Sequence, residues 1–163
     1  MSIVDDLKRS LDAKKGDDEN NNNSKDDGNI SSIRSDSNSN SKMNRAEKLH
    51  LVLKNLQNGS PDVEATALIS EDGLTIASAL PEDLDKTRIG GMSATLHSLG
   101  TRAAVELRRG IVKEVIVRGE QGYTVLLDAG RGVLLLAVAN ENASLGLIFF
   151  DMRETINKIK DIL

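Results

Sequence analysis

Residues 63–79 have the sequence VEATALISEDGLTIASA, and this stretch decides the fold. Two short runs rich in β-branched and apolar residues, Val63 to Ser70 and Leu74 to Ala79, flank the polar segment Glu71-Asp72-Gly73. An Asp-Gly pair between two such runs is a strong indication of a β-hairpin, because glycine readily adopts the positive φ of a tight turn. The stretch therefore predicts two antiparallel strands joined by a short turn.

Helical patterns lie on both sides of this hairpin. Upstream, an apolar stripe at helical spacing predicts a helix that ends near Asn58-Gly59. Its members are Ala46, Leu49, Val52, Leu53 and Leu56. Downstream, Asp85 to Leu107 contains no proline and predicts a long second helix. The apolar stripe of that helix consists of Ile89, Met92, Leu96, Leu99, Ala103 and Leu107.

Three further strands are predicted after the second helix. They cover Ile111 to Arg118, Tyr123 to Asp128 and Gly132 to Asn140. The glycine-containing turns between them indicate a meander. Lys113, Glu114 and Arg118 place charges on both faces of the first strand, which is typical of an edge strand. Val133 to Ala139 is apolar on both faces, which is typical of a central strand that is covered on both sides.

A closing helix completes the pattern. Ser144 is placed to cap it. Its apolar stripe consists of Leu145, Ile148, Met152, Ile156, Ile159 and Leu163, with charged residues on the other side. The predicted fold class is α/β, with the element order α-β-β-α-β-β-β-α.

The chain before Lys42 has a different character from this domain. Residues 13–41 are rich in Asn, Ser and Asp and hold too few apolar side chains to offset the entropy of ordering, so we expect a disordered linker. Residues 1–12 form a short amphipathic segment with apolar residues at helical spacing. That segment is either a frayed start without a role or a linear motif that docks on a partner or on the domain itself. Residues 42–163 are expected to form the one folded domain.

Composition excludes several classes of protein. The net charge of −4 and the pI of about 5.2 argue against nucleic acid as a partner, and only three aromatic side chains are available for base stacking. The chain has no cysteine, which fits a reducing compartment. The longest apolar run, Val133 to Ala139, is far shorter than the roughly 20 residues of a membrane span. We expect a cytoplasmic protein without a transmembrane segment.

No group of residues predicts catalysis. His50 and His97 fall in predicted helices, without neighbours at metal-ligand spacing. Gly130-Arg131-Gly132 lies between two strands, so it indicates a hairpin turn and not a phosphate-binding loop. Asp72 and Asp128 lie in predicted turns, where aspartate is favoured by turn geometry alone. We therefore expect no catalytic, metal or cofactor site and no enzymatic activity.

The second helix is crowded with small residues. They are Gly90, Gly91, Ser93, Ala94, Thr95, Ser98, Gly100 and Thr101. An interior glycine costs a helix up to about 1 kcal/mol relative to alanine, so a compensating contact is expected. Either the helix packs closely on its own sheet, or its small face receives another helix from a second copy or a partner.

These features resemble those of the roadblock family, the roadblock-type dynein light chains. Residues 60–78 look like the opening hairpin of that family, and the helix from Gly90 to Gly100 is similar to its central helix. Leu135 to Leu147, through Asn142 and Gly146, resembles its last strand and closing helix. The resemblance covers about residues 44–163. It implies a profilin-like or longin-like sandwich with a five-stranded antiparallel sheet, the central helix on one face and the terminal helices on the other.

The resemblance also implies a function. Family members form dimers through their central helices and edge strands, lack a catalytic site, and accompany small Ras-like GTPases, as in the Mgl system of gliding motility. We therefore expect a non-catalytic homodimer that binds and regulates or localises such a GTPase. The alternative is a scaffold subunit that heterodimerises with another roadblock-type protein without affecting GTP turnover. The expected interface residues are Gly90, Gly91, Ala94, His97, Ser98, Thr101, Lys113, Glu114 and Val115. The long polar tail departs from compact family members.

Overall fold

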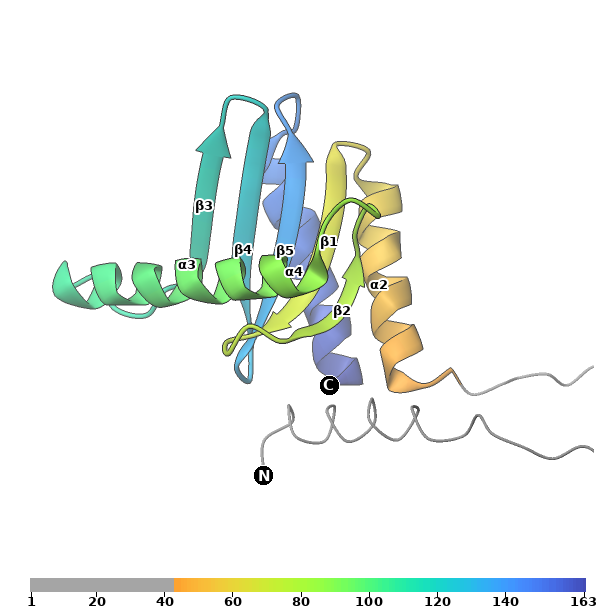
Figure 1. The fold of residues 1–163 in the computed structure, drawn as a ribbon, viewed down its shortest axis with the longest axis horizontal. Coiled ribbons are helices and arrows are strands. Elements are labelled where there is room, and N and C mark those ends of the chain that lie inside the picture. Colours follow the sequence, from red (N-terminus) through yellow and green to blue (C-terminus); the bar gives the residue numbers. More distant parts are fainter. Residues whose placement is uncertain (1–42) are drawn as a thin grey trace, which may run out of the picture. The chain divides into compact units, whose positions relative to one another are not determined.

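The computed structural model describes residues 43–163 as three helices and five strands in the predicted order (Figure 1). The elements are α2 (Arg45–Gly59), β1 (Val63–Ser70), β2 (Thr75–Ala79), α3 (Lys86–Glu106), β3 (Glu114–Gly119), β4 (Gly122–Gly130), β5 (Val133–Asn140) and α4 (Leu145–Ile162). The expected amphipathic segment (1–12) and linker (13–41) lie outside the described residues.

The five strands form one antiparallel sheet in the order β2-β1-β5-β4-β3. β1 and β2 form the predicted hairpin, and β3, β4 and β5 form the predicted meander. The uniformly apolar β5 lies at the centre, while β3, with charges on both faces, lies at an edge, and both predictions are confirmed. The hairpin between β4 and β5 turns through Arg131 and Gly132, whose φ values of 58° and 73° are those of a type I′ turn.

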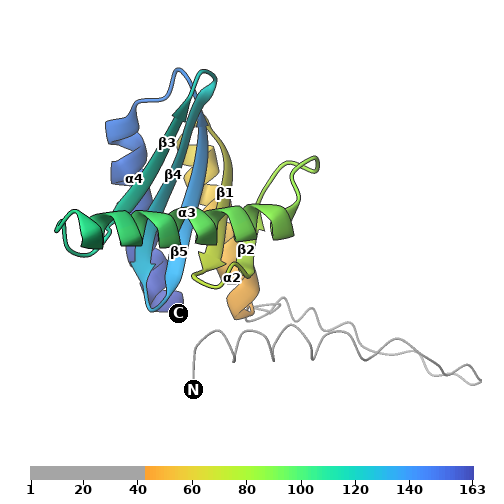
Figure 2. The same ribbon diagram turned by 60° about the vertical axis from the view of Figure 1, so that its left-hand side comes forward.

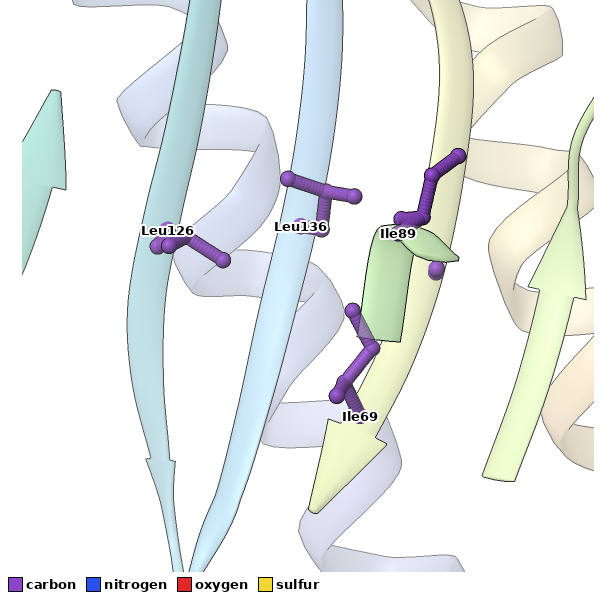
Figure 3. Packing of buried hydrophobic residues seen from close by; sticks show 5 residues of the cluster. Ile69, Ile89, Leu126 and Leu136 are labelled. Atoms are coloured by element: carbon purple, nitrogen blue, oxygen red, sulfur yellow. The ribbon is translucent and has the colours of Figure 1, made fainter. Parts of the chain in front are cut away.

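Helices cover the two faces of the sheet unequally (Figures 1 and 2). α3 crosses one face alone, while α2 and α4 lie side by side on the other. Beneath α3, one residue from each of four neighbouring strands forms a row across the sheet, in which each residue is the register partner of the next. The row consists of Ala67 on β1, Leu136 on β5, Leu126 on β4 and Val115 on β3. Ile89 of α3 packs onto the same cluster (Figure 3). The opposite face is closed by buried side chains of α2 and α4, including Leu49, Leu53, Met152 and Ile159.

Of the three helices in residues 43–163, two are capped by side chains at their start. Asn44 forms a capping box with Glu47, in which each side chain accepts from the other residue's backbone N–H at 2.9 Å. The Asp85 carboxylate accepts from the backbone N–H groups of Thr87 and Arg88. Ser144 occupies the predicted N-cap position of α4, but its side chain makes no capping hydrogen bond. The predicted N-cap position is confirmed, whereas the expected capping hydrogen bond is absent.

The strand expected from Ile111 begins three residues later, at Glu114. The cause is the end of α3, where the N–H of Arg109 donates to the carbonyl of Ala104 and the N–H of Arg108 to that of Val105. This pair of bonds, with Arg108 at φ 55°, is a Schellman ending. Gly110, at φ 82°, turns the chain further, so Ile111 belongs to the connection.

Candidate functional site

The glycines of α3 serve two different purposes. A Cβ atom on Gly90 would overlap the carbonyl oxygen of Gly73, and one on Gly100 would lie 2.9 Å from Cγ2 of Val115. Both glycines therefore allow close packing against the chain's own hairpin and sheet. Gly91, by contrast, has nothing within 4 Å of the position that its Cβ would occupy. Close packing of α3 on its own sheet, the first of the two interpretations, thus explains Gly90 and Gly100. No contact within the domain explains the glycine at position 91.

Gly90, Ala94, His97 and Thr101 share one stripe of α3, at the helical spacing i, i+4, i+7, i+11. The N-terminal end of this stripe is closed by the turn of the β1–β2 hairpin, since Ala94 also lies beside Gly73. The C-terminal end opens into a groove of about 590 Å³. His97, Thr101, Val105 and Arg108 line this groove from the helix and its end. Glu71, Gly110, Ile111, Val112 and Asp128 line the rest.

The neighbouring stripe, Gly91, Thr95, Ser98 and Arg102, is exposed along its whole length. The hydroxyl of Thr95 donates to the carbonyl of Gly91 at 2.8 Å, within the same helix. This internal bond lowers the cost of covering Thr95 with an apolar neighbour. A shallow hollow of about 420 Å³ lies along it, lined by Ala94, Thr95, Ser98, Leu99 and Arg102.

The apolar stripe expected to bury α3 is only partly buried. Ile89 is buried, but Met92 is 54 % exposed and Leu99 is 63 % exposed. The close contacts at Gly90 and Gly100 turn a different side of the helix toward the sheet, with Ser93 buried between them. The sequence interpretation therefore missed Leu99 as a surface residue. The buried side of this helix therefore combines small residues with Ile89 and Leu96, which are only part of the predicted apolar stripe.

α3 is longer than the sheet is wide. In Figure 1 its C-terminal end projects past β3, the free edge strand. Val105 on this projecting part is 66 % exposed, and Ile111 just beyond it is 79 % exposed. On β3 itself, Val117 is 43 % exposed although it lies on the face that α3 covers elsewhere. Val105, Ile111 and Val117 were not among the expected interface residues, and only their apolar character could have pointed to them.

The three expected interface residues around the start of β3 have different surroundings. The Glu114 carboxylate lies 3.5 Å from the guanidinium of Arg153 on α4, in an exposed ion pair. Val115 lies beneath Gly100 and is half-buried. The Lys113 carbonyl accepts from the N–H of Asp128, so the ladder extends one residue before the strand. The expected set is thus split between the inner side of α3, its outer side and the β3 edge.

The polar groups that could be mistaken for catalytic ones have structural partners. The Asp128 carboxylate accepts from the N–H of Gly130 at 2.7 Å, within the turn that follows it. The hydroxyl of Ser70 donates to the Asp72 carboxylate in the hairpin. Nδ1 of His50 lies 2.9 Å from the carbonyl oxygen of Ser78. Among residues 43–163, no three His, Asp or Glu side chains are grouped in a way that could hold a metal ion.

None of α2, α3 and α4 is both long and apolar enough to cross a bilayer.

Comparison with known proteins identifies a matching family. The family model of the Roadblock/LC7 domain matches residues 48–139. Two uncharacterized proteins from Methanocaldococcus jannaschii are each 32 % identical over 103 residues, a region that covers 63 % of this chain and 90 % of each relative.

Solved structures with this fold come from several bacteria. The Roadblock/LC7 domain from Streptomyces avermitilis superposes with a TM-score of 0.65 at 20 % identity, covering 69 % of this chain and 94 % of that one. Gliding protein MglB from Thermus thermophilus gives a TM-score of 0.66 at 20 % identity, covering 72 % and 90 %. MglB from Myxococcus xanthus gives 0.65 at 18 % identity, covering 71 % and 86 %. At these identities the likeness establishes the fold.

Proposed function

The chain belongs to the Roadblock/LC7 family, and we propose that it is a non-catalytic, homodimeric module that binds a small Ras-like GTPase and regulates or localises it. The observation that carries the proposal is the uncovered outer side of α3 beside the free edge of β3. This surface combines small residues at Gly91 and Ser98 with exposed apolar ones at Met92 and Leu99. An apolar surface of this kind on a folded domain is typical of a protein interface.

A two-fold arrangement would use both parts of this surface at once. Pairing of two β3 edges in antiparallel fashion joins the two sheets, and it brings the two α3 helices together on the same face. The projecting end of each α3 then covers the other copy's sheet, where Val117 is exposed. Small side chains at Gly91 and Ser98 let the two helices approach closely. One symmetric contact thus accounts for the helix overhang, the open edge and the exposed apolar residues.

The GTPase is proposed from the family resemblance together with the fold shared with MglB. Joining two α3 helices would create a broad platform, with the groove of about 590 Å³ at the C-terminal end of each α3 next to the two-fold contact. A partner held on this platform can be regulated by reordering its own switch loops, without a catalytic group from the dimer. The proposal places this interaction in the cytoplasm.

Calorimetric titration of the full chain with candidate GTPases tests the proposal. Each GTPase is loaded in parallel with GDP or with a non-hydrolysable GTP analogue. Binding that differs between the two nucleotide states is expected, with two chains in each binding unit. Failure of every GTPase encoded near this gene to bind in either state would contradict the GTPase assignment. A chain that is monomeric alone and dimeric with a second roadblock-type protein would favour the scaffold alternative.

A further inference from the structure

A second groove lies beside the C-terminal end of β2, at the sheet edge opposite to β3. Its volume is about 330 Å³, and residues of α2 and of the segment that links β2 to α3 line it. Figure 1 shows α2 and this segment near β2. His50, Lys54 and Gln57 line it from α2, at the spacing i, i+4, i+7 that aligns side chains on one helix face. The other lining residues are Ser78, Ala79, Leu80, Pro81 and Lys86.

Hydrogen bonds to the sheet hold the α2 wall of this groove in place. Nδ1 of His50 donates to the carbonyl of Ser78 at 2.9 Å, since a carbonyl can only accept, and Nε2 remains available as a second polar atom. Nε2 of Gln57 donates to the carbonyl of Glu64 at 2.6 Å. The wall is therefore formed before any ligand arrives, which lowers the cost of binding.

The fixed charge in the groove has one sign. Lys54 and Lys86 are its only lining residues with a permanent charge, and neither forms an ion pair among the described residues. Acidic residues of the linking segment, such as Glu82 and Asp83, do not line the groove. The Asp85 carboxylate is engaged by the N–H groups at the start of α3. The groove is thus complementary to negative charge.

β2 supplies a backbone edge next to these lysines. Among residues 43–163, it pairs with β1 and with no other strand. Ile76 and Ala79 are buried, whereas Thr75, Ala77 and Ser78 are half-buried. The Ser78 carbonyl already accepts from His50, so a ligand strand would meet the remaining backbone groups of this edge. An unpaired strand edge accepts an extended peptide through main-chain hydrogen bonds.

We propose that this groove binds an extended, acidic segment of a partner polypeptide. The segment adds to the free edge of β2 and places carboxylates beside Lys54 and Lys86. Alternate side chains of such a strand point to the same side, so acidic residues at every second position would meet the lysines. Because β2 and β3 lie at opposite edges of the sheet, this contact is independent of the proposed dimer and GTPase surface.

Fluorescence anisotropy with a short labelled peptide that alternates Glu with Val tests the proposal on the full chain. We expect saturable binding that weakens as salt is added. The double variant Lys54→Glu, Lys86→Glu should bind at least about tenfold more weakly. The matched control Lys48→Glu, Lys160→Glu makes the same change in net charge outside the groove and should bind like the unmodified chain. Equal loss in both double variants, or in neither, would overturn the proposal.

Two further probes separate a polypeptide strand from other anions. A peptide of equal charge in which every backbone nitrogen is methylated cannot donate the ladder hydrogen bonds, and we expect it to bind at least about tenfold more weakly. Equal binding of this peptide would overturn strand addition. Inorganic pyrophosphate should displace the labelled peptide only weakly. Displacement as effective as that by unlabelled peptide, with the same dependence on Lys54 and Lys86, would make the groove a small-anion site and overturn the proposal.

Discussion

Gly90 on α3 and Gly73 in the β1–β2 turn touch so closely that a Cβ atom on Gly90 would overlap the Gly73 carbonyl oxygen. This close contact sets the distance between α3 and the β1–β2 hairpin. Gly73 has a φ of 90°, which other residues rarely adopt, so neither partner can be replaced easily. The contact explains an interior helix glycine that would otherwise cost about 1 kcal/mol.

Gly90→Ala should lower the free energy of unfolding by about 1 to 3 kcal/mol, because the added methyl group meets backbone that cannot rotate away. Gly146→Ala is the control at a helical glycine of α4, outside the proposed dimer surface, where nothing lies within 4 Å of the added Cβ. It should raise stability by roughly 0.5 to 1 kcal/mol through helix propensity. Urea denaturation followed by circular dichroism measures both. Equal effects of the two substitutions would contradict the close contact.

The capping geometry predicts unequal effects at two helix starts. Asn44→Ala removes a side chain that accepts from the N–H of Glu47 and should destabilise the domain by about 1 kcal/mol. Ser144→Ala removes a side chain without a capping bond and should change stability by less than about 0.5 kcal/mol. Thermal denaturation of the two variants compares them. A larger loss at Ser144 would show that α4 is capped in solution.

The β4–β5 turn carries a residue that suits its geometry poorly. Arg131 has a φ of 58° at the first central position of the type I′ turn, where asparagine is favoured. Arg131→Asn should therefore raise the free energy of unfolding by up to about 1 kcal/mol. Arg131→Val, a β-branched control, should lower it instead. The prediction fails if both variants shift the urea midpoint in the same direction.

Arg102 tests whether the proposed dimer donates a catalytic charge. It is exposed on the outer stripe of α3 that also carries Ser98. If the dimer acts by ordering the GTPase, Arg102→Ala should change single-turnover GTP hydrolysis by no more than a few fold at saturating dimer. An arginine that stabilises the transition state is worth about 10³ or more. A loss of that size would contradict a purely positioning role.

Much of the fold could be predicted from local patterns. The Asp-Gly pair predicted the hairpin. The uniformly apolar sequence of β5 predicted the centre of the sheet, and the charges on both faces of β3 predicted its edge. Central and edge strands differ in burial, and each therefore has a distinct pattern of apolar and charged residues. The start of β3 was placed too early. The end of α3 depends on the left-handed backbone conformation of Arg108. An arginine in the sequence does not predict this conformation, because positive φ values are usually found at glycine or asparagine.

The site could be predicted only in outline. Small residues marked α3 as unusual, but they could not show which of them face inward. Gly90 and Gly91 are adjacent and chemically identical, yet one contacts the hairpin and the other faces open space. That difference depends on where the hairpin turn lies in three dimensions. For the same reason Met92 and Leu99, at core-like spacing, were assigned to the wrong side.

The central claim is that a second copy covers the outer side of α3. Light scattering after size-exclusion chromatography tests it most directly, with the full chain and its Ser98→Arg variant. Ser98 is exposed, whereas the neighbouring Ala94 is half-buried beside Gly73, so a charge at Ser98 disturbs the interface without straining the fold. We predict twice the chain mass of 17.6 kDa for the unmodified chain, and the mass of one folded chain for the variant. A monomeric unmodified chain, or a variant that stays dimeric, would contradict the account.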